Sequence, residues 1–360
     1  MTKKYKMSEF IPEIGESFAL YKGKDVLERI GENIIKEVVI SILCGGNVRS
    51  LTEGLTRRRL ALSNAALLVT FLKSYNKIDD FIEELPEIVK KELLTKISPG
   101  KKMFLQWFVG LTGKSIQNVL RSNEDEYDKY LENIELSLKR SVENCKIDFG
   151  ELRGELQLKN VACAVDWEFI LYLFTAIGAQ TLSIRGSEKS IYGKMFEKLI
   201  LGTLLSIFGF RLINPEDSSQ NNKVFWLSSR GDKRESDATL LYKPGVGVRF
   251  DIGFIGPGNT EISLDKVSRF EREMEHGRQN HYMSTIIIVD RIGEKSRIAD
   301  MAKAIDGDIV QMSMAYWVKD VCKILKEKIG FEHKLLKIPN RQVKSYIESR
   351  MAQIDLNTFF

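Results

Sequence analysis

The sequence predicts a mixed α/β protein, in which a helical N-terminal region precedes a mixed β-sheet flanked by helices. Apolar residues recur at three- and four-residue spacing through most of residues 1–155, which is the pattern of amphipathic helices. From residue 210 onward, short runs rich in β-branched and aromatic residues are separated by turn residues. Helical patterns alternate with the later runs, which favours a mixed sheet with helices on both faces.

The N-terminal region, residues 1–155, is predicted to consist of successive helices. Helical patterns cover residues 24–43, 62–75, 81–97, 102–111 and 124–144. The first ends at "CGGN", where glycine permits the chain to leave the helix. The last is strongly charged and is expected on the surface. We interpret this region as one domain that could bind DNA or support dimerisation.

Residues 156–360 are predicted to form the second domain, which contains the sheet. Two helices are expected first, at 166–179 and 187–209, with Ser187 as the N-cap of the second and Gly209 as its terminator. Strands are expected at 210–213, 223–229, 237–242, 247–255, 284–290 and 308–314. Helices are expected at 263–276, 295–305 and 315–329. The run "STIIIVD" (284–290) indicates a strand buried on both faces.

Composition narrows the functional classes. The net charge of +5 permits binding to nucleic acid but does not require it. The longest apolar stretches, 199–210 and 169–179, are shorter than the ~18 residues of a membrane span. The N-terminus shows no signal sequence, and the four cysteines contain no CxxC pair. We therefore expect a cytoplasmic protein with no membrane association.

Two aspartates stand out in "DATLLYKPGVGVRFDIGF" (237–254), which we interpret as two antiparallel strands joined at a Gly/Pro turn. Asp237 opens the first strand and Asp251 lies within the second. Carboxylates on paired strands repel each other unless a cation lies between them. A divalent metal ion bound with phosphate oxygens would resolve this repulsion. Alternatively, Asp237 could cap its strand and Asp251 could pair with a structural arginine.

A third acid, Glu197, lies on the predicted helix before the strands, among mostly apolar residues. An acid on the buried side of a helix is costly unless it is paired or binds a metal ion. The other interpretation is a solvated acid at the helix edge, paired with Lys194 or Lys198.

This order of an inward Glu, an Asp at a strand start and a second acid on the next strand resembles the PD-(D/E)XK nuclease core. Residues 183–325 are similar to Type II restriction endonucleases, in particular the CfrBI-like branch. The resemblance implies that Asp237 and Asp251 bind Mg²⁺ and that Glu197 supports them. It also implies double-stranded DNA as substrate and a DNA methyltransferase as the companion enzyme that protects the host.

The resemblance fails at one position. The family has a lysine two residues after the second acid, and this chain has Gly253 there. We expect Lys266, on the first turns of the following helix, to position the attacking water instead, with Arg269 as the alternative. Lys266 could equally be an ordinary solvated lysine.

Two basic clusters are candidates for DNA contacts. The favoured one precedes Glu197, near the expected start of a helix, where phosphate binds well, and consists of Arg185, Lys189 and Lys194. The other consists of Arg57, Arg58 and Arg59, which could also be a solvated basic face.

The sequence therefore predicts a Mg²⁺-dependent Type II restriction endonuclease that cuts a short palindromic sequence. Two-fold symmetric cleavage calls for two active sites, so we expect a homodimer. The alternative is a non-catalytic DNA-binding or regulatory module that kept a degenerate nuclease core, and Gly253 is the feature that supports it.

Overall fold

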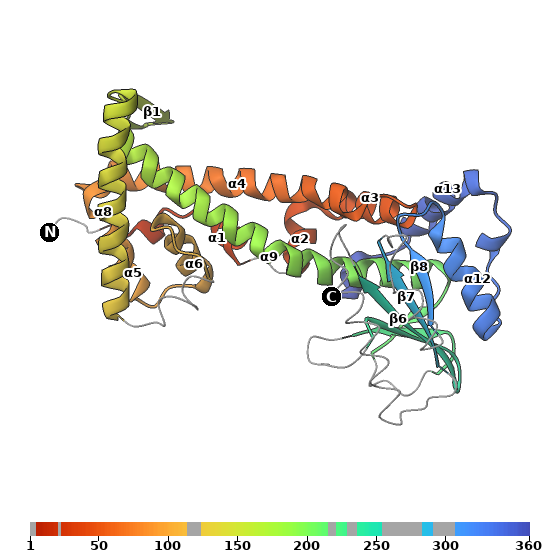
Figure 1. The fold of residues 1–360 in the computed structure, drawn as a ribbon. Helices are drawn as coiled ribbons and strands as arrows, with labels where there is room; N and C mark the ends of the chain where they lie inside the picture. Colours follow the sequence, from red (N-terminus) through yellow and green to blue (C-terminus); the bar gives the residue numbers. More distant parts are fainter. Residues whose placement is uncertain are drawn as a thin grey trace. The chain divides into compact units, whose positions relative to one another are not determined.

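The computed structural model describes residues 5–20, 23–113, 124–214, 221–228, 236–253, 283–290 and 307–360. Its contacts divide the chain into two compact units. The first unit contains Met1–Lys22 and Leu55–Ser190, and the second contains Gly23–Gly54 and Ile191–Phe360. The mixed α/β class is confirmed (Figure 1). The predicted domain boundary after residue 155 stays a prediction, and the helices expected at 263–276 and 295–305 lie outside the described residues.

The first unit is mainly helical. Its elements are η1 (Met7–Glu9), α1 (Glu13–Ala19), most of α4 (Val48–Lys77), α5 (Phe81–Leu93), α6 (Pro99–Phe108), α8 (Glu124–Phe149), β1 (Gly154–Leu158), β2 (Val161–Val165) and the first part of α9 (Trp167–Ile207). Phe71 lies at the centre of its aromatic core and packs edge-on against Phe81 and Phe169. The expected helices at 62–75, 81–97, 102–111 and 124–144 correspond to α4, α5, α6 and α8.

The start of α6 shows how the sequence sets a helix end. Ser98 lies in an extended conformation before Pro99, and its Oγ accepts a hydrogen bond of 3.2 Å from the backbone N–H of Lys101. Proline suits the first position of a helix because its missing N–H would have no partner there.

The second unit contains the main sheet. Its helices are α2 (Gly23–Ile30), α3 (Glu32–Leu43), the start of α4, the end of α9, α12 (Trp317–Ile329) and α13 (Asn340–Met351), with short helices η2 (Lys334–Leu336) and η3 (Leu356–Phe359). Its strands are β3 (Arg211–Leu212), β4 (Val224–Leu227), β5 (Ala238–Lys243), β6 (Val246–Gly253), β7 (Met283–Val289) and β8 (Gly307–Gln311).

The six strands form one mixed sheet in the order β3-β4-β5-β6-β7-β8. β5 is antiparallel to both of its neighbours, whereas β6, β7 and β8 run parallel. All six predicted strands are therefore present. Ile286 to Val289 of β7 are buried on both faces of the sheet, as the unbroken apolar run predicts.

The β5–β6 hairpin turns at Pro244 and Gly245. Gly245 has φ +74°, a conformation that glycine adopts without steric cost. The pairing shifts by one residue between Leu241 and Lys243, so Tyr242 is an extra residue on β5. Because side chains alternate between faces, this bulge decides which residues of β5 and β6 face each other.

The helix α9 differs from the prediction. Two helices were expected, with Ser187 capping the second, but α9 runs without a break from Trp167 to Ile207. The Oγ of Ser187 instead donates a hydrogen bond of 2.9 Å to the carbonyl oxygen of Ile184, one turn earlier. The expected termination near Gly209 is confirmed, because this glycine follows the helix with φ +87°.

The same helix is long and apolar enough to cross a membrane, judged by its length and composition alone. Leu199, Ile200, Leu204 and Leu205 on α9 are fully buried inside the protein. The C-terminal part of α9 is therefore packed in the core, whereas Phe174 and Leu182 in its first part are largely exposed, at 59% and 70%.

Candidate active site

The two candidate aspartates are brought together by the β5–β6 pairing. Ala238 pairs with Phe250 and Thr239 with Arg249. Continued by one residue, this register sets Asp237, directly before β5, opposite Asp251. Residues opposed in this way have Cβ atoms about 5 Å apart and side chains on the same face of the sheet. The sequence prediction that the two carboxylates lie on adjacent strands therefore agrees with the structure.

A hydrogen bond fixes the Asp237 side chain. Its Oδ2 accepts a bond of 2.8 Å from the backbone N–H of Ile252, the residue after Asp251. The backbone carbonyl of Asp237 in turn accepts from the N–H of Ser228 at 3.1 Å. Asp237 is thus held from both sides, between the ends of β4 and β6.

The two aspartates differ in burial. Asp251 is only 2% exposed, whereas Asp237 is half-buried. The opposite face of β6 carries Val248, Phe250 and Ile252, all fully buried. The carboxylates therefore occupy one face of a strand whose other face belongs to the hydrophobic core.

The donor set fits a hard divalent cation. Mg²⁺ is usually held by one or two carboxylates together with water and substrate phosphate oxygens. Within the described ranges, no group of three His, Cys, Asp or Glu side chains is arranged to hold a metal ion. A divalent ion held by Asp237 and Asp251 would have positions open for water and phosphate oxygens.

Glu197 lies on α9 in the same unit as the two aspartates. It is half-buried, and its neighbours on the same side of the helix include the exposed Lys194 and the buried Ile200 and Leu201. Its support of a metal ion stays a prediction.

Comparison with known proteins decides the family. A sequence model of the CfrBI restriction endonuclease family matches residues 32–297. The chain belongs to the CfrBI restriction endonuclease family. It is 40% identical over 346 residues to the Type II restriction enzyme CfrBI of Citrobacter freundii, and the alignment covers 93% of each chain. No solved structure matches. The resemblance predicted from the sequence is confirmed.

In a chain of the CfrBI restriction endonuclease family, Gly253 leaves open which residue supplies the positive charge of the missing lysine. This glycine ends β6 at the position where the PD-(D/E)XK pattern has lysine. Lys266 and Arg269, the predicted substitutes, lie outside the described residues. Other side chains can therefore supply the positive charge beside the aspartates.

The predicted DNA-contacting residues are placed as follows. Arg57 and Arg58 are exposed on α4, and Arg185 and Lys194 are exposed on α9. Lys189 also lies within α9. It was predicted to lie near the start of a helix, and that part of the prediction is wrong.

Arg59 differs from its neighbours on α4. It is 2% exposed, and its guanidinium donates a hydrogen bond of 2.6 Å to the carbonyl oxygen of Phe18. Its side chain is directed into the first unit, so it is not exposed to a DNA backbone.

Two further charged residues of the sheet were missed from the sequence. Arg249 lies on β6 two residues before Asp251, and therefore on the same face. Asp290 directly follows β7 and is 8% exposed. Burial raises the pKa of its carboxyl group, and its Oδ1 has no hydrogen-bond partner among the described residues. Period-two counting from Asp251 would have found Arg249, and the acid ending "STIIIVD" would have pointed to Asp290.

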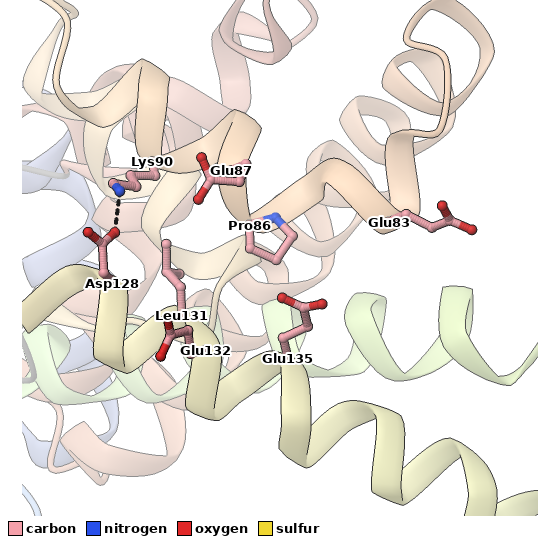
Figure 2. A pocket seen from close by; sticks show the side chains of 8 residues that line it. All are labelled: Glu83, Pro86, Glu87, Lys90, Asp128, Leu131, Glu132 and Glu135. Carbon is pink, nitrogen blue, oxygen red and sulfur yellow. Dashed lines mark ion pairs between the residues drawn. The ribbon is translucent and has the colours of Figure 1, made fainter.

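An acidic pocket lies elsewhere, between α5 and α8 of the first unit (Figure 2). Its volume is about 310 Å³, and its lining residues are Glu83, Pro86, Glu87, Lys90, Asp128, Leu131, Glu132 and Glu135. Lys90 forms an ion pair with Asp128. Glu87 and Glu135 are paired with Lys91 and Lys139, and the excess of acids in the lining disfavours phosphate there.

Proposed function

We propose that the chain is a Mg²⁺-dependent Type II restriction endonuclease that cuts double-stranded DNA at a short palindromic sequence. The observation that carries the proposal is the pairing that sets Asp237 opposite Asp251 on one face of the sheet, in a chain of the CfrBI restriction endonuclease family. The 40% identity with the Type II restriction enzyme CfrBI supports the same substrate class.

The reaction is the hydrolysis of a phosphodiester. The oxygen of a water molecule bonds to phosphorus and gives up a proton, one P–O ester bond breaks, and the departing oxygen gains a proton. A bound Mg²⁺ would activate the water and stabilise the charge that develops on the phosphate. Asp237 and Asp251 would hold the ion, and Glu197 would orient its water ligands.

The protein environment prepares the carboxylates for this role. The hydrogen bond from the N–H of Ile252 fixes the orientation of the Asp237 carboxylate. The burial of Asp251 limits its movement, so an ion would meet two preorganised ligands.

Arg57, Arg58, Arg185, Lys189 and Lys194 are the proposed DNA contacts. They would bind phosphates along the duplex and position it without reading its sequence. We propose further that the enzyme acts as a homodimer, since cutting both strands of a palindrome uses two symmetric sites. A methyltransferase of the same system would protect host DNA in the cytoplasm.

Incubation of the purified chain with long natural DNA and Mg²⁺ tests the proposal. Discrete fragments with reproducible ends support a Type II endonuclease, and EDTA should abolish them. Binding without cleavage would favour the alternative, a DNA-binding module with a degenerate core, for which Gly253 is the supporting feature.

A further inference from the structure

Arg249 lies on β6, one pair of residues away from the two aspartates on the same face of the sheet. It pairs with Thr239 of β5 on one side and Thr285 of β7 on the other. Asp251 is two residues further along β6, and Asp237 is two residues before Thr239. Side chains in a strand return to the same face every second residue, so all three charged groups share one face.

The separations fit a direct electrostatic role. Two residues along a strand cover about 6.6 Å, and diagonal cross-strand neighbours are about 7–8 Å apart, which long side chains can span. Thr239 and Thr285 are small and nearly buried, at 8% exposure each. Of the three paired residues Thr239, Arg249 and Thr285, the half-buried Arg249 is therefore the one with a charged side chain.

A positive charge at this place is favourable on physical grounds. Asp251 is almost fully buried, and a buried carboxylate close to another is strongly unfavourable without a neighbouring positive charge. Gly253 cannot supply that charge, whereas Arg249 lies at the mirror position, two residues before Asp251 instead of two after it.

We propose that Arg249 supplies the positive charge that the lysine at position 253 would supply in the PD-(D/E)XK pattern. Its guanidinium would bind a non-bridging oxygen of the scissile phosphate beside the Asp237–Asp251 pair. Arginine stays protonated at all physiological pH values, so it stabilises negative charge and takes no proton from the water. This inference rests on the proposed function.

The proposal makes a prediction that a purely structural arginine does not. A cation beside two carboxylates repels a metal ion, so removing it should tighten metal binding. The same removal should slow cleavage at saturating metal, because the phosphate loses a stabilising contact. A residue needed only for folding would weaken metal binding and cleavage together.

The test compares the wild type with Arg249→Met, which keeps an apolar stem, and Arg249→Lys, which keeps the charge. The matched control is Arg211→Ala, an exposed arginine on the edge strand β3 of the same sheet. Single-turnover cleavage of a DNA fragment containing a mapped site is measured over a range of Mg²⁺ concentrations. Calorimetric titration with Ca²⁺ measures metal binding on the protein–DNA complex without turnover.

Arg249→Met should lower the maximal rate at least ~10²-fold. It should also bind Ca²⁺ about sevenfold more tightly, the effect in water of removing a unit charge some 7 Å from a divalent ion. Arg249→Lys should cleave at least about tenfold faster than Arg249→Met, because lysine restores the positive charge. Arg211→Ala should match the wild type in both measurements.

A maximal rate for Arg249→Met equal to that of the wild type overturns the proposal, as does a joint loss of rate and Ca²⁺ affinity. If Arg249→Met does not fold, Arg249→Gln is judged by the same two criteria. Failure of the wild type to cut would instead overturn the proposed function, so the two failures are distinguishable.

Discussion

Asp237 accepts a hydrogen bond from the backbone N–H of Ile252, and this contact holds its carboxylate beside Asp251 on the next strand. The bulge at Tyr242 is what makes the arrangement possible. Without the extra residue, the pairing of Lys243 with Val246 would continue along the hairpin and set Asp237 opposite Ile252. The two carboxylates would then occupy opposite faces of the sheet.

The Asp237→Asn variant should fold normally but lose cleavage. The amide oxygen of asparagine can still accept the hydrogen bond from Ile252, whereas its uncharged side chain is a poor ligand for Mg²⁺. Thermal unfolding and cleavage of DNA in Mg²⁺ measure the two effects. Wild-type cleavage by this variant would remove Asp237 from the set of metal ligands.

Glu197→Gln should slow cleavage less than the change at Asp237. Glu197 is half-buried on α9, and the described side chains form no three-acid metal group, so we expect it to act through water. Parallel cleavage time courses of the two variants provide the comparison. An equal loss in both would make Glu197 a direct ligand and contradict this ranking.

Lys266→Ala tests the candidate from the sequence against Arg249. If Lys266 replaces the missing lysine, Lys266→Ala should lower the cleavage rate by ~10²-fold and change DNA binding little. If Arg249 fills the role instead, Lys266→Ala should cut at close to the wild-type rate. Measuring both variants on the same DNA separates these outcomes, and a large loss in each would show that both cations act.

The fold was largely predictable because its signals are local. The spacing of apolar residues indicated the main helices, and "KPGVG" together with the alternating runs indicated the β5–β6 hairpin. The hairpin of β1 and β2, with Lys159 at φ +54° in its turn, was missed because both strands are short and lie beside long helices. The continuity of α9 was missed because Ser187 looks like a cap in sequence and acts as an internal hydrogen-bond donor in the structure.

The candidate site was predictable only in part. The acids could be found because each lies in an apolar run. The buried position of Arg59 depends on a contact with Phe18, 41 residues away, and no local pattern encodes it. Arg249 was overlooked because the family pattern directs attention to the residues after the second acid.

His333 should make the stability of the second unit depend on pH. Its ring stacks on Phe331 and packs against Phe208 and Tyr346. Burial, with help from Lys334 and Arg350, lowers the pKa of His333 from 6.5 to about 4. The folded state therefore prefers the neutral ring, and this preference stabilises the fold fully above pH 6.5.

That contribution should be lost as the pH falls from about 6.5 to about 4, because the unfolded chain takes up a proton that the folded chain resists. The measurement is the thermal unfolding midpoint between pH 7.5 and pH 4.5, for the wild type and His333→Gln. The variant should show the shallower decline, whatever its midpoint at pH 7.5. Parallel declines would mean that the pKa of His333 is the same in the folded and unfolded chains.

The most direct test of the Asp237–Asp251 site is the cleavage of DNA by Asp251→Asn in Mg²⁺, with binding of the same DNA measured in Ca²⁺. Asp251 is the most buried acid of the proposed site, and asparagine has nearly the same shape, so the fold should survive. We predict no discrete fragments at times when the wild type has cut to completion, together with retained DNA binding. Fragments formed at the wild-type rate would contradict the assignment of the catalytic metal ion to this pair of aspartates.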